Sequence, residues 1–237
     1  MANRVAIIGG GIIGCTTAGL LAEAGSQVTL VEATAIGAGA SGRNSGTIQH
    51  PFDPVLLPLH LETVEAYHAL AAADPEFRFP AEPVGILLLT DDIDAGTERA
   101  AELAAAFPDL APEMLDTAAT SRAEPSLAQR WAAVRVATGY PVVPEAATHA
   151  MAARAVRAGA TIRIGRAARP WIENGQVRGL AFDDGERLAA DGVLVAGGPW
   201  TPGVLGTDLA WPPVARTWGV TIQVAMADPP SHVLEEG

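Results

Sequence analysis

A glycine-rich segment near the N-terminus carries the clearest chemical signal in the sequence. Residues 9–14 read Gly-Gly-Gly-Ile-Ile-Gly, which has the pattern Gly-x-Gly-x-x-Gly, and they directly follow the apolar run at residues 5–8. A short apolar run with β-branched residues is typical of a buried parallel strand. A glycine turn between a strand and a helix can bring backbone N–H groups against the phosphates of a dinucleotide.

Each glycine of this pattern has its own expected role. Gly9 permits a tight turn out of the strand, Gly11 lets the backbone approach a pyrophosphate, and Gly14 lets the next helix lie close to the strand. We expect that helix at residues 12–24, with Gly25 as its C-terminal stop. The first N–H groups of the helix and its positive dipole end would then face the phosphates.

A carboxylate stands at the end of the next predicted strand. Residues 27–31 form that strand, and Glu32 follows it, with Ala33 next in the chain. At this distance from the glycine motif, an acid is expected to accept a hydrogen bond from a ribose 2′-hydroxyl. A 2′-phosphate would be repelled there, so NADP is disfavoured. Because these features occur in order, dinucleotide binding is favoured over a glycine turn without a ligand.

A long loop of small and polar residues follows the second strand. Residues 37–47 read Gly-Ala-Gly-Ala-Ser-Gly-Arg-Asn-Ser-Gly-Thr. A backbone of this kind can run close to an extended ligand and donate N–H bonds to it, whereas the alternative is a flexible linker. Because Arg43, Asn44 and two serines stand among the glycines, and an apolar helix is expected at residues 55–72, we favour a loop that wraps a ligand.

Several motifs together resemble a known family. Residues 5–14, 31–32 and 39–46 resemble, in this order, the opening motifs of the FAD-dependent oxidoreductases that include glycine oxidase, sarcosine oxidase and D-amino-acid oxidase. Residues 140–144, which lead into a predicted helix, resemble the return of that family to its FAD-binding domain. Residues 192–200 resemble its later strand and the glycine turn beneath the FAD.

The resemblance implies that FAD is the cofactor and indicates which residues would hold it. Glu32 would hold the adenosine ribose. Ala168, on the strand after the helix predicted at residues 145–158, would reach the adenine through its backbone. Residues 12–14 would lie at the pyrophosphate with residues 40–41 nearby, and residues 45–47 would approach the flavin. The expected cofactor-binding residues are Gly9, Gly11, Ile12, Ile13, Gly14, Glu32, Ala33, Ala40, Ser41, Arg43, Asn44, Ser45, Gly46, Thr47, Ala168, Gly197 and Gly198.

The same resemblance implies an α/β fold, in which a Rossmann-like FAD-binding domain carries an inserted α+β substrate domain and the C-terminal portion of the family fold is missing. We expect residues 1–80 and 140–214 to form the FAD-binding domain, and residues 81–139 and 215–237 to form an incomplete substrate domain. In the insertion, Asp94 is expected to cap a helix.

The last predicted strand implies a partner. A strand is expected at residues 215–225, and without neighbours it would leave an exposed edge. We therefore expect a second polypeptide to complete the fold. It would be a separate subunit or the other half of a cleaved precursor.

The activity that the resemblance implies is oxidation of a small amino acid or amine by hydride transfer to the flavin, followed by hydrolysis of the imine. No catalytic residue is assigned. His50 is a candidate on the substrate side, although a structurally bonded histidine is favoured. Two alternatives stay open: a FAD-dependent 2-hydroxy-acid oxidoreductase, and a non-catalytic subunit that holds FAD or transfers electrons.

Composition narrows the remaining classes. With 15 basic and 27 acidic residues the net charge is −12, which argues against a nucleic-acid-binding surface. The single cysteine, Cys15, excludes a disulfide within the chain, and no cluster of His, Cys, Asp and Glu has metal-ligand spacing. No signal-peptide pattern or membrane-spanning apolar run is present, so a cytoplasmic protein is expected.

Overall fold

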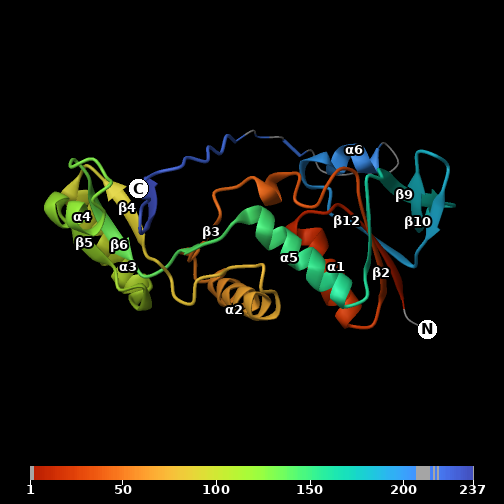
Figure 1. Cartoon of the computed structure of the whole chain (residues 1–237), viewed down its shortest axis with the longest axis horizontal. Helices are drawn as coiled ribbons and strands as arrows, with labels where there is room; N and C mark the ends of the chain where they lie inside the picture. Colours follow the sequence, from red (N-terminus) through yellow and green to blue (C-terminus); the bar gives the residue numbers. More distant parts are fainter. Residues whose placement is uncertain (1–2, 207–213, 216, 218, 237) are drawn as a thin grey trace. The chain divides into compact units, whose positions relative to one another are not determined.

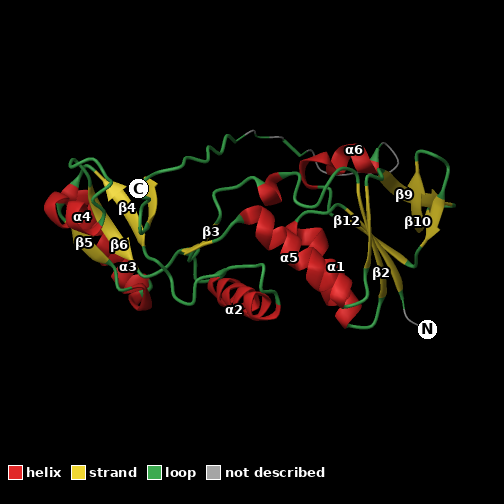
Figure 2. Cartoon of the chain, viewed as in Figure 1, coloured by secondary structure: helices red, strands yellow, loops and turns green. Residues whose placement is uncertain are grey.

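The computed structural model describes residues 3–206, 214–215, 217 and 219–236. The chain divides into two compact units (Figure 1). Unit 1 consists of Met1–Ser45 and Val143–Thr221, and unit 2 consists of Gly46–Val142 and Ile222–Gly237. Figure 2 shows that each unit contains both helices and strands.

Unit 1 is built on a parallel sheet with the strand order β12-β1-β2-β8. Helices α1 and α5 pack against each other on one face of this sheet, and a three-stranded antiparallel sheet, β11-β10-β9, covers the other (Figure 1). The elements are β1 (Arg4–Ile8), α1 (Ile12–Glu23), β2 (Gln27–Glu32), α5 (Pro144–Arg157), β8 (Thr161–Ile164), β9 (Ala168–Glu173), β10 (Gln176–Phe182), β11 (Arg187–Ala189), β12 (Gly192–Val195) and α6 (Thr201–Leu205).

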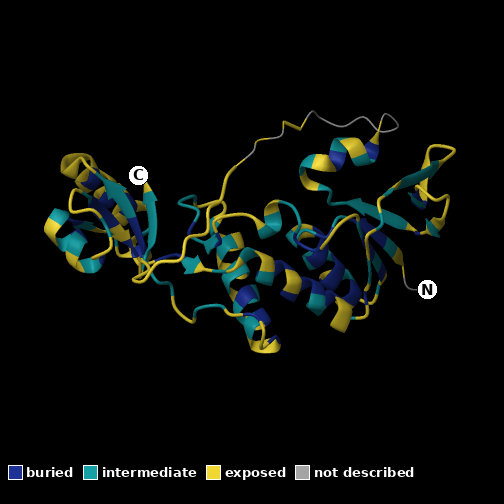
Figure 3. Ribbon diagram, turned by 45° about the horizontal axis from the view of Figure 1, so that its top comes forward, coloured by how far each residue is buried: buried dark blue, intermediate teal, exposed yellow. Residues whose placement is uncertain are grey.

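Alternation along the strands explains why both faces of the parallel sheet are covered. Ala6 and Ile8 of β1 pack with Leu180 and Phe182 of β10, while Ile7, which points the opposite way, is fully buried as well. Figure 3 shows the buried residues gathered in the strands and on the inner sides of the helices. The apolar run read from the sequence is therefore a strand buried on both sides, which confirms the predicted α/β class.

Unit 2 contains a second four-stranded sheet, with the order β13-β4-β6-β5. Strand β13 runs parallel to β4, and the other neighbours are antiparallel. The elements are β3 (Thr47–Ile48), α2 (Leu57–Ala73), β4 (Ile86–Thr90), α3 (Ile93–Ala106), β5 (Glu113–Leu115), α4 (Thr117–Ala123), β6 (Ala132–Val136), β7 (Tyr140–Pro141) and β13 (Val233–Glu236).

The division into units differs from the expected domain boundaries mainly at α2. The sequence placed residues up to 80 with the FAD-binding domain, whereas the compact units divide after Ser45. Contacts that are distant in sequence explain this difference. The ring of Tyr67 on α2 packs near Phe77 and Phe79, and Phe79 in turn stacks on Tyr140 with ring centroids 5.1 Å apart.

Two local predictions are wrong. Asp92, not Asp94, caps α3, since its Oδ1 accepts hydrogen bonds from the N–H groups of Asp94 and Ala95, both at 3.0 Å. The strand expected at residues 215–225 is absent from residues 214–215, 217 and 219–225, while residues 216 and 218 lie outside the described residues. A strand needs a neighbour for its ladder, and in the described part of the chain this segment pairs with none.

A buried carboxylate fixes the segment that leads into β13. Glu124, which ends α4, is 2% exposed, and its Oε2 accepts hydrogen bonds from the backbone N and Oγ of Ser231, both at 2.9 Å. It also accepts from the backbone N of His232 at 3.2 Å and lies 3.1 Å from His232 Nδ1. Burial by itself raises the pKa of Glu124, but the hydrogen bonds from His232 and Ser231 outweigh it and lower the pKa below 4.5.

None of the helices in the described part of the chain combines the length and the apolar character needed to cross a membrane.

Replacing this carboxylate tests how β13 is held. Glu124→Ala should lower the free energy of unfolding of unit 2 by about 3 kcal/mol, because buried donors lose their acceptor. Glu102→Ala removes an exposed ion pair with Arg99 and should cost less than about 0.5 kcal/mol. Because the pKa of Glu124 is lowered in the folded protein, its contribution is present above about pH 4.5 and is lost as the pH falls further. Urea denaturation of both variants at pH 7 and pH 3 measures the difference, and equal losses for the two variants would contradict the anchoring role.

Candidate cofactor site at the glycine turn

The turn from β1 into α1 has no space for side chains at two positions. Gly9 adopts a φ of +116°, and a Cβ there would lie 2.3 Å from the carbonyl oxygen of Ala196. A Cβ on Gly14 would lie 2.0 Å from the carbonyl oxygen of Gly9. Both distances are far inside van der Waals contact, so only glycine permits this turn, and it brings the ends of β1 and β12 together.

The start of α1 presents backbone donors. The N–H of Ile12 donates to Ser41 Oγ at 3.0 Å, and the helix has no other side-chain cap. Among the described residues, the N–H groups of Ile13 and Gly14 meet no acceptor. Beside them, a Cβ on Gly11 would meet only the side chain of Ser41, with its hydroxyl at 3.0 Å. A helix start with free N–H groups and a bare backbone is suited to an anion such as a pyrophosphate.

Glu32 sits at the end of β2 and is bonded to the turn. Its Oε2 accepts from the backbone N of Gly10 at 2.7 Å, and its Oε1 accepts from the N and Oγ1 of Thr34 at 2.7 and 3.0 Å. An ionised carboxylate has about four acceptor positions, so capacity remains for a ribose hydroxyl. Sequence reasoning missed the contacts of Glu32 with Gly10 and Thr34, and with them its second role of holding the glycine turn in place.

The loop after β2 is packed in its first part. The N–H of Gly37 donates to the Gly10 carbonyl at 2.9 Å, and the buried Thr148 of α5 donates from Oγ1 to the Ser41 carbonyl at 3.2 Å. The side-chain amide of Asn44 donates to the Ala40 carbonyl at 3.0 Å. These contacts hold the loop against α5 and the glycine turn, so it is not a free linker. In the sequence, the only indication of these contacts is the hydroxyl of Thr148 within a predicted helix.

The remaining predicted residues of unit 1 lie around the same strand ends. The backbone N of Arg166 donates to the Glu32 carbonyl at 3.0 Å, which brings the start of β9, where Ala168 lies, beside the end of β2. Ala168 was expected on the first strand after helix α5. That strand is β8, and Ala168 instead begins the second strand, β9. A Cβ on Gly9 would lie 3.3 Å from the N of Gly197.

Four more of the predicted cofactor-binding residues lie in unit 1, close in sequence to the residues described above. Ala33 directly follows Glu32, Arg43 and Ser45 belong to the packed loop, and Gly198 begins the turn after β12 with a φ of +52°. The carbonyl of Arg43 accepts a hydrogen bond from Thr221 Oγ1 at 3.2 Å.

Gly46, Thr47 and His50 belong to unit 2. The Gly46 carbonyl accepts from the N of Val142 at 2.8 Å, and Thr47 pairs with Pro141 in the β3–β7 ladder. His50 is 6% exposed. Its backbone N donates to Thr138 Oγ1 at 2.8 Å, and its Nδ1 accepts from the N of Phe52 at 3.0 Å. Burial lowers the pKa of His50, so it is held as a neutral, structurally bonded imidazole at neutral pH.

Cys15 is a packing residue of α1. It is fully buried, and its thiol lies 3.6 Å from the Gly10 carbonyl. Burial and, to a smaller extent, the charge of Glu32 raise the pKa of this thiol to about 12, so no reactive thiolate forms at neutral pH. The described residues contain no group of three or more His, Cys, Asp and Glu side chains that could hold a metal ion.

Substitution by alanine should have different effects at Gly11, where the ligand is proposed to approach, and at Gly14, where the turn itself leaves no space. Gly11→Ala should still fold, at a small cost in stability because the Ser41 side chain must shift, and should weaken FAD binding tenfold or more, because the added methyl stands where the pyrophosphate would approach. Gly14→Ala should destabilise unit 1 itself, since the methyl overlaps the Gly9 carbonyl. Gly203→Ala on α6, where a Cβ meets nothing within 4 Å, is the matched control. Fluorescence titration with FAD and thermal unfolding separate the effects; undiminished FAD affinity in Gly11→Ala would contradict the placement.

Solved structures of similar fold include one that is named as an oxidase and one that is named as a dehydrogenase. The glycine oxidase of Bacillus cereus matches with a TM-score of 0.72 and 28% sequence identity, over 85% of this chain and 57% of the glycine oxidase chain. The L-proline dehydrogenase of P. horikoshii matches with a TM-score of 0.71 and 24% identity, over 89% of this chain and 57% of its own, and supports the fold alone. This chain therefore spans little more than half the length of these proteins.

Sequence comparison adds a shorter match and a family. The bifunctional tRNA 5-methylaminomethyl-2-thiouridine biosynthesis protein MnmC of Nitrosospira multiformis is 42% identical over 69 residues, which is 29% of this chain and 11% of that protein. The model of the family described as FAD dependent oxidoreductase matches residues 4–235. The resemblance seen in the motifs is thereby confirmed: the chain belongs to the DAO family of FAD-dependent oxidoreductases.

Proposed function

We propose that this chain binds FAD and forms part of an oxidoreductase that oxidises a small amino acid or amine. The observation that carries the proposal is the pair of N–H groups at Ile13 and Gly14 that meet no acceptor in the described part of the chain, together with the carboxylate at the end of β2. The family is FAD-dependent, and the 28% identity to a glycine oxidase supports an amine or amino acid as substrate.

The roles of the chain's residues follow from the geometry of unit 1. The N–H groups of Ile13 and Gly14 bind the pyrophosphate, with the Ser41 hydroxyl beside them. The carboxylate of Glu32 accepts a hydrogen bond from the adenosine ribose while it holds the N–H of Gly10. The loop that ends at Ser45 leads toward the flavin. Within unit 1 the proposed set is completed by Ala33, Ala40, Arg43, Asn44, Ala168, Gly197 and Gly198. Gly46 and Thr47, which follow Ser45 in the chain, are proposed on the family resemblance alone.

The bound flavin supplies the chemistry by accepting a hydride from the α-carbon of the substrate. The substrate would lose this hydride and one N–H proton and become an imine, which water would hydrolyse to a keto acid or aldehyde and to ammonia or an amine. Oxygen, a quinone or a protein carrier would then take the two electrons. Among the residues assigned to unit 1, none is proposed as a general base. Their part is to bind and orient the cofactor.

We further propose that a second polypeptide, a separate subunit or the other half of a cleaved precursor, completes the fold. Residues 219–226 support this, because Val220, Ile222 and Val224 recur at every second position and are 67–87% exposed. The alternation gives this segment, which forms no strand in the described part of the chain, one exposed apolar side, and a partner would cover it. Intact-mass analysis of everything that co-purifies with a tagged chain tests it; a monomer that binds FAD and turns over alone would contradict it.

Substrate class is tested by anaerobic bleaching of the flavin. Two matched pairs differ only in an amino or a hydroxyl group: alanine with lactate, and glycine with glycolate. The proposal predicts bleaching by at least one amino compound and none by its hydroxy partner, in protein that retains every co-purifying chain. Bleaching by the hydroxy acids alone would overturn the amine assignment. A flavin that no compound in a broad amine screen reduces would instead indicate a non-catalytic subunit.

A further inference from the structure

A tryptophan of unit 1 packs directly on the loop that follows β2. Trp200 ends the short 3₁₀ turn Gly198–Trp200 between β12 and α6, and it is 49% exposed. A Cβ on Gly39 would lie 3.0 Å from Cζ3 and 3.3 Å from Cη2 of its indole. A side chain at position 39 would therefore press on the benzo edge of the ring, and glycine is what lets the loop backbone lie against it.

Gly39 also sets the position of a residue that contacts the start of α1. It precedes the 3₁₀ turn η1 (Ala40–Gly42), and its carbonyl accepts from the N of Gly42 at 3.2 Å. Within this turn, Ser41 presents the hydroxyl that accepts the N–H of Ile12 at 3.0 Å. A movement of Gly39 would therefore carry the Ser41 hydroxyl with it, at the point where the pyrophosphate is proposed to bind.

The same turn is held from α5 as well. Thr148 Oγ1 donates to the Ser41 carbonyl at 3.2 Å, and a Cβ on Gly42 would lie 3.7 Å from the Cβ of Glu145. Trp200 adds a contact from the segment that follows β12. A glycine-rich loop loses much conformational freedom when it becomes ordered, so contacts that order it before a ligand arrives favour binding.

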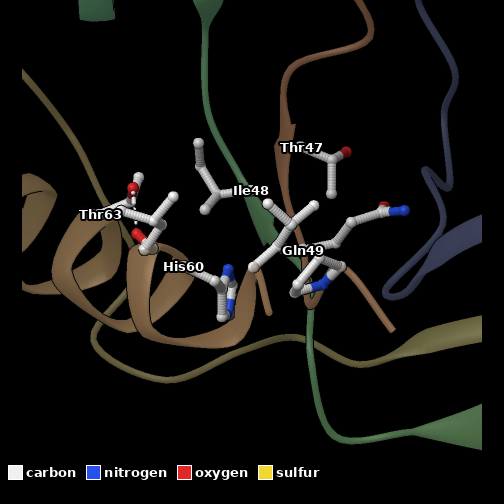
Figure 4. Close-up of a pocket in the computed structure, with 8 residues that line it drawn as sticks. Thr47, Ile48, Gln49, His60 and Thr63 are labelled. Atoms are coloured by element: carbon white, nitrogen blue, oxygen red, sulfur yellow. Dashed lines mark hydrogen bonds between the residues drawn. The ribbon is translucent and has the colours of Figure 1, made fainter. Parts of the chain in front are cut away.

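A separate hollow lies in unit 2, at the start of α2. It is bounded by residues of β3 and α2, among them Thr47, His60 and Thr63 (Figure 4). Gly39 and Trp200 both belong to unit 1, so their contact lies within one compact unit.

We propose that Trp200 is a positioning residue of the FAD site. Its indole holds the loop at Gly39, so that the Ser41 hydroxyl and the first N–H groups of α1 are ordered before the pyrophosphate binds. This inference rests on the proposed function for the identity of the ligand. The indole acts through the loop and needs no contact with the cofactor. Because Trp200 is half exposed, loss of its ring should loosen residues 37–43 while the sheet of unit 1 stays folded.

Two tryptophan variants in unit 1 test this role, in protein that retains every co-purifying chain. Trp200→Ala should weaken FAD binding at least tenfold. The matched control is Trp171→Ala on β9, where the guanidinium carbon of Arg187 lies 4.4 Å from the centroid of the Trp171 ring. The control should change FAD affinity less than twofold. Titration followed by flavin fluorescence measures both variants, and equal effects would overturn the inference.

A double-mutant cycle tests the contact between the indole and the loop. The φ of Gly39 is −91°, outside the left-handed region, so the indole is the obstacle that an alanine there would meet. Gly39→Ala should weaken FAD binding at least fivefold. Trp200→Phe keeps a ring but lacks the benzo edge, so Gly39→Ala should cost at least threefold less affinity in that background. The same cost in both backgrounds would contradict the contact, and this test stands even if Trp200→Ala does not fold.

Amide hydrogen exchange in the FAD-free protein separates this inference from the proposed function. Trp200→Ala should speed exchange of the hydrogen-bonded amides of Gly37, Gly42 and Arg43 at least fivefold and leave the central amides of α5 unchanged. Unchanged exchange in the loop would show that Trp200 does not hold it. If the wild-type chain binds no FAD, the proposed function fails and the role in FAD binding fails with it, while the exchange measurement still decides whether Trp200 orders the loop.

Discussion

The chain leaving β1 turns into α1 so tightly that a single methyl group at Gly9 or Gly14 would overlap a carbonyl oxygen. This lack of space sets the arrangement of unit 1. It lets β12 continue beside β1, with the N of Ala196 donating to the Ile8 carbonyl at 2.8 Å. It also aims the start of α1 at the edge where the parallel strands end. In open α/β sheets, this carboxyl edge is where ligands bind.

Two groups of opposite charge lie at that edge: the carboxylate of Glu32 and the positive dipole end at the start of α1. The carboxylate accepts the N–H of Gly10, and the Ser41 hydroxyl accepts that of Ile12, so these two donors are already satisfied. The donors of Ile13 and Gly14 are left, and they lie at the positive end of the helix dipole. The same acid that would hold a ribose therefore also shapes the turn. A change at Glu32 would alter both the proposed ribose contact and the turn, whereas a change at Gly11 would act on the proposed approach of the ligand and on the Ser41 hydroxyl that accepts the N–H of Ile12.

Local pattern was enough to predict the part of the fold that is built from neighbouring residues. The strand before the glycines, α1, β2 and the position of Glu32 depend on spacing within about 30 residues, and the combination with residues 39–46 and 192–200 identified the family. Contacts made across the chain were not predictable in this way. The place of α2 in unit 2 depends on the stacking of Phe79 on Tyr140, and the order in the loop depends on Thr148 from α5. The stacking has no signal in its own segment, and the contact from α5 has only the hydroxyl of Thr148 within an otherwise ordinary helix.

The proposed activity depends on FAD bound at the start of α1 in unit 1. A visible absorption spectrum of the purified protein, with every co-purifying chain retained, shows whether the cofactor binds. We expect flavin bands with about one FAD per chain, either as isolated or after incubation with FAD and removal of the excess. A folded protein that stays colourless after that treatment, with all its partners present, would rule out the FAD site.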